Sequence, residues 1–256
     1  MNAENAGATA RTATLTYGII CYAIFFLTFL YAIGFVGNLL VPKTIDGKPI
    51  IGMMQALIVD LVLLGVFAIQ HSVMARSGFK KVWTRIVPEQ AERSTYTLFS
   101  SLALILLFAY WQPLGVVVWN VTNPIGAGIL WAGFAFGWGL VLVSTFLINH
   151  FDLFGLRQVW LFFRKQPYTQ LRFAEPWLYR VIRHPLYMGW LFAFWCTPTM
   201  TATHLVFAVT TTAYILIAIQ LEEHDLEQAH KDYAAYKQRV PMLIPRLIRK
   251  QRQALP

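Results

Sequence analysis

Long runs of apolar residues alternate along the chain with shorter stretches that carry most of its charge. An α-helix that crosses the ~30 Å apolar core of a bilayer needs about 20 residues. Six apolar runs cover residues 15–41, 52–74, 95–111, 125–148, 186–200 and 203–221. The third and fifth are short for a full crossing. The pattern predicts an all-α polytopic integral membrane protein with about six transmembrane helices, and a count of five stays open.

The distribution of Lys and Arg predicts which side of the membrane each segment faces. With six spans, 19 of the 21 cations fall in the N-terminal segment, the second and fourth loops and the C-terminal tail. The third loop, 112–124, and the fifth loop carry none. Because cytoplasmic segments are enriched in Lys and Arg, we expect both termini to be cytoplasmic in a bacterial-type inner membrane.

Composition agrees with a protein embedded in a lipid bilayer. Hydrophobic residues make up 57% of the chain and charged residues only 13%, about half the charge of a soluble domain. The net charge of +9 follows from membrane topology, and no basic stripe on a soluble fold indicates nucleic-acid binding. Without an internal repeat or linker, residues 1–256 are expected to form a single domain. Residues 1–150 supply a four-span part, and residues 151–256 supply the ligand-binding part described next.

A candidate ligand site begins where the fourth loop meets the fifth apolar run, at Arg183-His184-Pro185-Leu186-Tyr187-Met188-Gly189. Proline is favoured at the first position of a helix because its missing N–H would have no partner there. A helix that begins at Pro185 directs free backbone N–H groups toward the cytosolic boundary, where they attract a carboxylate. Arg183 can add a bidentate contact. A merely interfacial role for Arg183 and His184 is the alternative.

Acidic residues interrupt the basic bias at the end of the last apolar run, in Leu221-Glu222-Glu223. Apolar and aromatic residues then recur in steps of three and four over 226–240, so the helix is expected to continue to about Arg239. Glu222 falls on this stripe and Glu223 on the neighbouring polar face. We therefore expect Glu222 to point into the protein. The proline-flanked segment that follows, 240–245, is expected either to fold back as a lid or to lie on the bilayer.

Further polar residues are expected at the same cytosolic face. His71 ends the second apolar run, and His150 and Asp152 follow the fourth. Arg183 and a helix N-terminus suit a carboxylate, a glutamate suits an ammonium group or a ribose, and Tyr and Trp rings suit an adenine and a sulfonium cation. S-Adenosylmethionine is one ligand that matches this inventory. The histidines lack metal-ligand spacings, so no metal is expected, and no GxSxG, Walker or Rossmann pattern occurs.

The C-terminal part contains an ordered set of motifs. They are Arg183-His184-Pro185-Leu186-Tyr187-Met188-Gly189, Glu222-Glu223 with Leu226, Tyr233-x-x-Tyr236 and Val240-Pro241-x-Leu243-Ile244-Pro245. This set resembles the C-terminal module of isoprenylcysteine carboxyl methyltransferase-like membrane proteins. The resemblance implies that S-adenosylmethionine binds between the last two spans and the C-terminal helix. It assigns to the cofactor site Arg183, His184, Pro185, Tyr187, Glu222, Glu223 and Tyr233.

Three upstream stretches, 70–76, 92–96 and 149–155, look closer to one branch of that superfamily, the methanethiol S-methyltransferases, which make dimethyl sulfide. The NnrU-like proteins are a weaker match. The chain departs from many members of the superfamily at His230 and Trp177, where those members have glycine. The resemblance implies a small thiol as the substrate. A lipid-like or isoprenylcysteine carboxylate acceptor, and a non-enzymatic NnrU-like role in the membrane, are the alternatives.

Transfer to a thiol implies a set of catalytic residues. The thiolate is the nucleophile, and a small alkyl thiol is mostly protonated at neutral pH. A general base near the sulfur is therefore expected, with His150 as the first choice and His71 as the second. Asp152 is expected to orient such a histidine, and Tyr187 to position the methyl group or the thiol.

Overall fold

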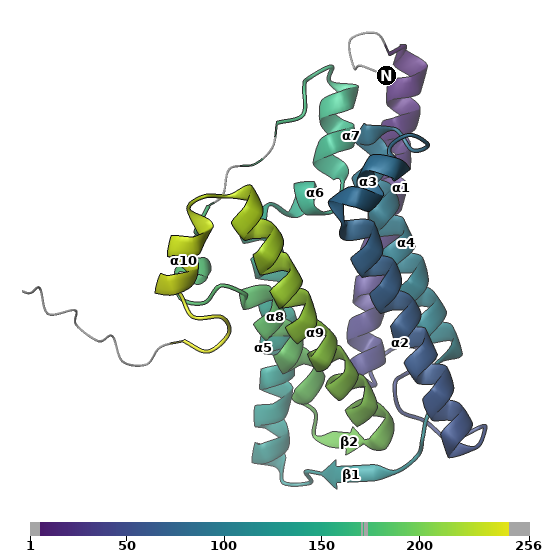
Figure 1. The fold of residues 1–256 in the computed structure, drawn as a ribbon. Helices are drawn as coiled ribbons and strands as arrows, with labels where there is room; N and C mark the ends of the chain where they lie inside the picture. The colour runs from purple at the N-terminus through teal and green to yellow at the C-terminus, as the bar shows by residue number, and fades with distance from the viewer. Residues whose placement is uncertain (1–5, 170, 172–173, 246–256) are drawn as a thin grey trace, which may run out of the picture.

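The computed structural model of the protein describes residues 6–169, 171 and 174–245. Five helices are long and apolar enough to cross a membrane, namely α1 (Ala8–Gly37), α2 (Met53–Ala75), α4 (Glu89–Tyr110), α5 (Pro124–Ile148) and α9 (Ala202–Ala229). The short helices are α3 (Ser77–Trp83), α6 (His150–Leu153), α7 (Leu156–Phe163), the 3-10 turn η1 (Trp177–Arg180), α8 (Pro185–Trp195) and α10 (Tyr233–Arg239). The protein is therefore an all-α polytopic membrane protein, as the apolar pattern predicted (Figure 1).

The fifth predicted span, 186–200, is not a full transmembrane helix. It forms the 11-residue helix α8 and then an extended segment that includes strand β2 (Thr199–Thr201). Such a helix is about 16 Å long, roughly half of the apolar core. β2 pairs antiparallel with β1 (Val117–Asn120), a ladder that the sequence did not predict. α8 and β2 still carry the chain back to the end of the bundle where α9 begins (Figure 1). The chain therefore runs in the same alternating directions as it would with six full spans.

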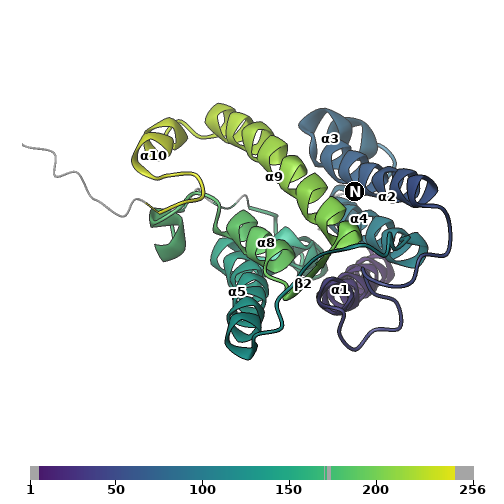
Figure 2. The same ribbon diagram turned by 90° about the horizontal axis from the view of Figure 1, so that it is seen from below.

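α9 lies between two groups of helices. In one group α4 packs against both α1 and α2, and in the other α8 packs along α5, while α9 contacts α2 and α8 (Figure 2). The backbones of α5 and α8 touch where Gly137 faces Gly189, since a Cβ on Gly189 would lie 2.8 Å from the Gly137 carbonyl oxygen. Small residues allow this close approach of membrane helices. Gly189 therefore fixes the position of α8, which carries the candidate site in its first turn.

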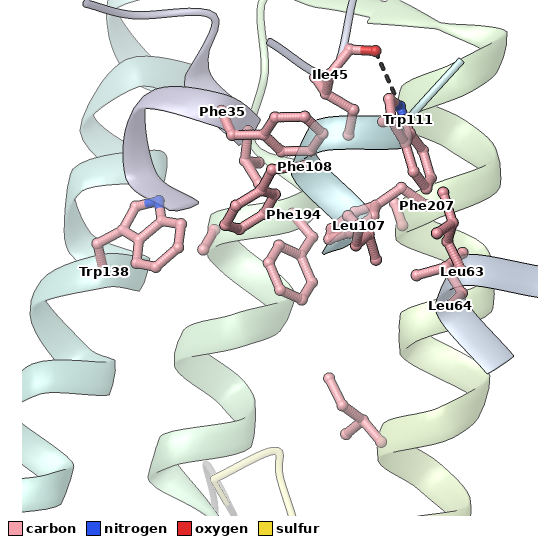
Figure 3. Close-up of a cluster of buried hydrophobic side chains, with 14 of the residues drawn as sticks. Phe35, Ile45, Leu63, Leu64, Leu107, Phe108, Trp111, Trp138, Phe194 and Phe207 are labelled. Carbon is pink, nitrogen blue, oxygen red and sulfur yellow. Dashed lines mark hydrogen bonds between the residues drawn. The ribbon is translucent and has the colours of Figure 1, made fainter. Parts of the chain in front are cut away.

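The main apolar cluster is aromatic and draws on both groups of helices (Figure 3). Phe35 of α1, Phe108 of α4 and Phe194 of α8 belong to it, together with Phe207 of α9. Trp111 is fully buried, and its indole N–H donates to the carbonyl oxygen of Ile45 at 3.1 Å, so even the polar edge of this ring has a partner. The cluster holds α8 and α9 against the first three long helices.

The prediction of one continuous helix to Arg239 is wrong. α9 ends at Ala229, and α10 begins only at Tyr233. After the turn, α10 folds back, so that Tyr233 and Tyr236 pack with Val240 against Leu226. The three-and-four spacing is thus satisfied by two helices that bury a small cluster between them, and not by one long stripe.

Candidate functional site

A buried ion-pair network joins the start of α8 to the end of α9. Nε of Arg183 donates to Oε1 of Glu223 at 2.7 Å, and Nε2 of His184 lies 2.9 Å from the same oxygen. Nζ of Lys237, in α10, lies 3.1 Å from the other carboxylate oxygen. The side chain of Glu223 is 2% exposed and that of Arg183 is 9% exposed. Hydrogen bonds to Glu227 and to Glu223 raise the pKa of Lys237, so this group stays charged at neutral pH.

The prediction that Glu222 is the inward carboxylate is wrong. Glu223 is buried and Glu222 is exposed. Because α9 ends at Ala229, the stripe extrapolated from 226–240 does not define its inner face. That face is defined by the preceding turns, where Ile215 and Ile219 are buried in steps of four that lead to Glu223.

Glu222 contributes to the site from the outer side of the network. Its Oε2 accepts a hydrogen bond of 2.9 Å from the hydroxyl of Tyr187. The charge of Glu222 also helps to raise the pKa of Tyr179, after the larger effect of burial. The hydroxyl of Tyr179 is buried and has no hydrogen-bond partner among the residues that the structure describes. A carboxylate and two phenols therefore meet beside the first turn of α8.

The proline-flanked segment folds back onto the start of α8. The backbone N–H of Arg183 donates to the carbonyl oxygen of Pro241 at 2.9 Å, and that of His184 to Met242 at 3.1 Å. The guanidinium of Arg183 also donates to the carbonyl oxygens of Lys237 and Val240. Of the two placements considered for 240–245, lid or bilayer surface, the fold-back over α8 is the one observed. The basic tail beyond residue 245 lies outside the described residues.

The N-terminus of α8 keeps the character expected of an anion site. Pro185 occupies its first turn, and His184, at the N-cap position, makes no capping hydrogen bond with its side chain. The imidazole of His184 bonds to Glu223 instead. The first turn thus has no side-chain cap, and its N–H groups suit a carboxylate. Tyr233, which the family resemblance assigned to the cofactor site, is 2% exposed. Its phenol interacts electrostatically with Glu223 and Arg183.

A second polar cluster surrounds His71 on the inner side of α2. The hydroxyl of Tyr96 lies 2.9 Å from Nε2 and 3.1 Å from Nδ1 of His71, and Oγ of Ser100 lies 3.1 Å from Nδ1. The ring of Phe67 stacks on the imidazole with 5.2 Å between centroids. Two hydroxyls from α4 therefore hold the imidazole of His71.

Tyr187 connects the two clusters. Its phenol interacts electrostatically with those of Tyr214 and Tyr96, while its hydroxyl bonds to Glu222. Tyr214, in the middle of α9, shares a hydrogen bond of 3.0 Å with Ser72. Sequence analysis missed Tyr96 and Tyr214 as site residues. The available signal was a phenol within an apolar run, since a buried Tyr hydroxyl usually finds a partner.

His150 lies in a different place, between α1, α5 and α6. Its Nε2 is 2.8 Å from the hydroxyl of Tyr22 and its Nδ1 is 2.8 Å from Oγ1 of Thr145. Its ring stacks on Phe146 with 4.3 Å between centroids, and the residue is 3% exposed. Burial lowers the pKa of His150. Both nitrogens of this histidine are therefore engaged in holding helices together.

The prediction that Asp152 orients His150 is wrong. Asp152 pairs with Arg157 at 2.8 Å and accepts a longer hydrogen bond of 3.4 Å from Tyr168. Residues two apart on a helix do not share a face, so the single turn of α6 directs these two side chains apart. Asp152 ties α6 to α7 and to the loop that follows. Among the described residues, no group of three or more His, Cys, Asp or Glu could hold a metal ion.

Comparison with known proteins places these features in a family. No family model matches the chain, and no solved structure matches it. The methanethiol S-methyltransferase of Crocosphaera subtropica is 56% identical over 237 residues, which cover 92% of this chain and 93% of that protein. That of Mycobacterium tuberculosis is 53% identical over 236 residues, which cover 92% and 97%. Nurim of Bos taurus is 31% identical over 185 residues, which cover 66% and 68%. Identity above one half along nearly the whole length shows that this chain, a membrane methyltransferase, belongs to the methanethiol S-methyltransferase family.

Proposed function

We propose that this protein transfers a methyl group from S-adenosylmethionine to methanethiol and releases dimethyl sulfide. The reaction takes place at the end of the bundle that carries α10, which we expect to face the cytoplasm of a bacterial cell. One observation carries the proposal. In a chain more than half identical to methanethiol S-methyltransferases, the stretch that begins at Arg183 is bonded to Glu223, with Glu222 and Tyr187 at the open edge of this contact.

The polar groups around the first turn of α8 fit S-adenosylmethionine. The uncapped N-terminus of α8 suits the carboxylate of the methionine moiety. The exposed carboxylate of Glu222 can accept hydrogen bonds from an ammonium group or from ribose hydroxyls. The buried hydroxyl of Tyr179, which lacks a partner in the described part of the chain, leaves a polar atom for the ligand to satisfy.

The chain's own residues act by holding and aligning the reactants. When bound, S-adenosylmethionine supplies a methyl group on a positively charged sulfur. The network of Glu223, Arg183 and His184 fixes the start of α8, and Glu222 holds the hydroxyl of Tyr187 by a hydrogen bond. The fold-back of segment 240–245, with Leu243 packed on the main apolar cluster, keeps water away from one side. Alignment of this kind can supply several kcal/mol of the rate enhancement.

Labelled methyl donor provides the test. Purified protein is incubated with methyl-labelled S-adenosylmethionine and a panel of thiols, and volatile sulfides are collected from the headspace. Labelled dimethyl sulfide from methanethiol is expected. A parallel incubation with an isoprenylcysteine checks the carboxylate alternative. If protein that binds S-adenosylmethionine methylates no thiol, the proposed function is refuted, and methylation of the isoprenylcysteine alone would assign the other acceptor class.

A further inference from the structure

We propose that the acceptor thiol binds beside His71, between α2, α4, α8 and α9, and that His71 takes the proton of the thiol. This inference rests on the proposed methyl transfer to a small thiol and names the site and the base for it. Tyr96 and Ser100 serve as positioning residues that hold the imidazole.

Tyr187 lies between the ion-pair network and the cluster around His71. The phenol of Tyr187 bonds to Glu222 on one side and interacts with Tyr96 and Tyr214 on the other. Tyr96 in turn bonds to His71. Polar side chains therefore extend from the edge of the ion-pair network toward the imidazole of His71.

The two candidate histidines differ in their exposure. His150 is 3% exposed, with a hydroxyl on each nitrogen. His71 is only half-buried, and its neighbours Ser72 and Tyr214 are half-buried as well. A substrate must touch the base that deprotonates it, and the greater exposure of His71 meets this requirement. Both nitrogens of His71 also lie within hydrogen-bond distance of hydroxyls of α4, so the thiol takes the place of one of these contacts when it binds.

The surroundings of His71 suit a small thiol chemically. The ring of Phe67 stacks on His71, and its centroid lies 6.4 Å from that of Tyr214. One wall of the site is therefore apolar and suits a methyl group. The hydroxyls of Tyr96 and Ser100 hold the imidazole from α4, and a neutral imidazole has one nitrogen lone pair that can accept a proton.

The proposed step balances atoms and charge. The S–H bond of methanethiol breaks and its proton passes to a nitrogen of His71. The thiol sulfur forms its bond to the methyl carbon as the bond between that carbon and the sulfonium sulfur breaks. Dimethyl sulfide and the neutral thioether of the donor remain, and the imidazolium of His71 later releases one proton to water. Proton transfer by a positioned side chain typically contributes about 10²–10⁴-fold to the rate.

The test compares His71→Gln with His150→Gln in lipid nanodiscs. His71→Gln is expected to lower kcat about 10²–10⁴-fold at neutral pH while the affinity for S-adenosylhomocysteine, measured calorimetrically, stays within threefold. The defect should shrink with 2,2,2-trifluoroethanethiol, which is a more acidic thiol and needs less help to ionise. His150→Gln should lower the melting temperature and keep the wild-type form of the pH–rate profile.

A readout that does not depend on turnover separates this inference from the proposed function. In ¹⁵N-histidine NMR spectra with S-adenosylhomocysteine bound, methanethiol is expected to shift the signal that disappears in His71→Gln. A shift of the His150 signal instead, or equal losses of kcat in both variants without rescue by the acidic thiol, would overturn the assignment. Tyr96→Phe, which keeps the ring, should lower kcat with little change in KM. If the wild-type protein forms no dimethyl sulfide, the proposed function fails, and the NMR shift still reports on thiol binding.

Discussion

Replacing Glu223 with glutamine removes the only carboxylate that contacts both Arg183 and His184 in the described residues. Loss of one partner of a buried ion pair costs ~3–5 kcal/mol. The lower end applies here, because Arg183 keeps two carbonyl oxygens and Lys237 keeps Glu227 at 2.9 Å. About 3 kcal/mol corresponds to roughly a 100-fold change in the docking equilibrium of α10.

Hydrogen exchange measured by mass spectrometry can detect this undocking. In Glu223→Gln the amides of residues 233–240 should exchange up to about 100-fold faster, with weaker binding of S-adenosylmethionine. Glu227→Gln is the matched control, since Glu227 is 38% exposed and contacts only Lys237 among the described ion pairs. An exposed pair contributes ~1 kcal/mol or less. Exchange rates in Glu223→Gln that match those of the control would refute the idea that this network docks α10.

The remaining predictions concern packing, specificity and pH. Gly189→Ala places a Cβ 2.8 Å from the Gly137 carbonyl oxygen, so α8 must shift at a cost of about 1–3 kcal/mol; calorimetry should show a lower Tm, and an unchanged Tm would contradict the close crossing. Phe67→Ala opens the apolar wall beside His71, so the ratio of kcat/KM for propanethiol to that for methanethiol should rise in headspace assays, whereas an unchanged ratio would exclude that wall from the site. Because the pKa of Lys237 is raised, its contribution to docking is complete below the ordinary lysine pKa of about 10.4 and is lost only as pH rises through the higher folded value. Limited proteolysis near residue 230 should therefore not change between about pH 8 and pH 9, a window above the ordinary titration range of an imidazole such as that of His184, and a change within that window would argue against Lys237 as a docking contact.

The long helices could be predicted because a lipid environment demands long apolar runs. Each of the five helices that can span a membrane overlaps one of the predicted runs. The short α8 could not be predicted from its apolar character alone, since the run continues past Trp195 through Cys196. What ends the helix is Pro198 three residues later and the pairing of β2 with β1, a contact between segments far apart in the sequence.

The residues of the candidate site could largely be predicted from the sequence, but the contacts that each of them makes could not. The partnership of the stretch at Arg183 with the two glutamates followed from topology. The choice between Glu222 and Glu223 failed because it depended on a helix end that no residue pattern marked. Both His150 and His71 were predicted as candidate bases, and the partners of His71 could not be predicted because they come from α4, which is distant in sequence.

The short α8 explains how the candidate cofactor site and the proposed acceptor site can lie side by side. Tyr214 lies twelve residues into α9, about 18 Å along its axis from the strands. Tyr187 lies eight residues before the end of α8, about 12 Å along the helix, and the extended segment after Trp195 supplies the rest. A full crossing of about 20 residues would move the first turn of α8 some 13 Å farther out. Tyr187 would then lie away from Tyr214 and Tyr96, so the shortness of α8 is what places the helix N-terminus at the level of the proposed acceptor site.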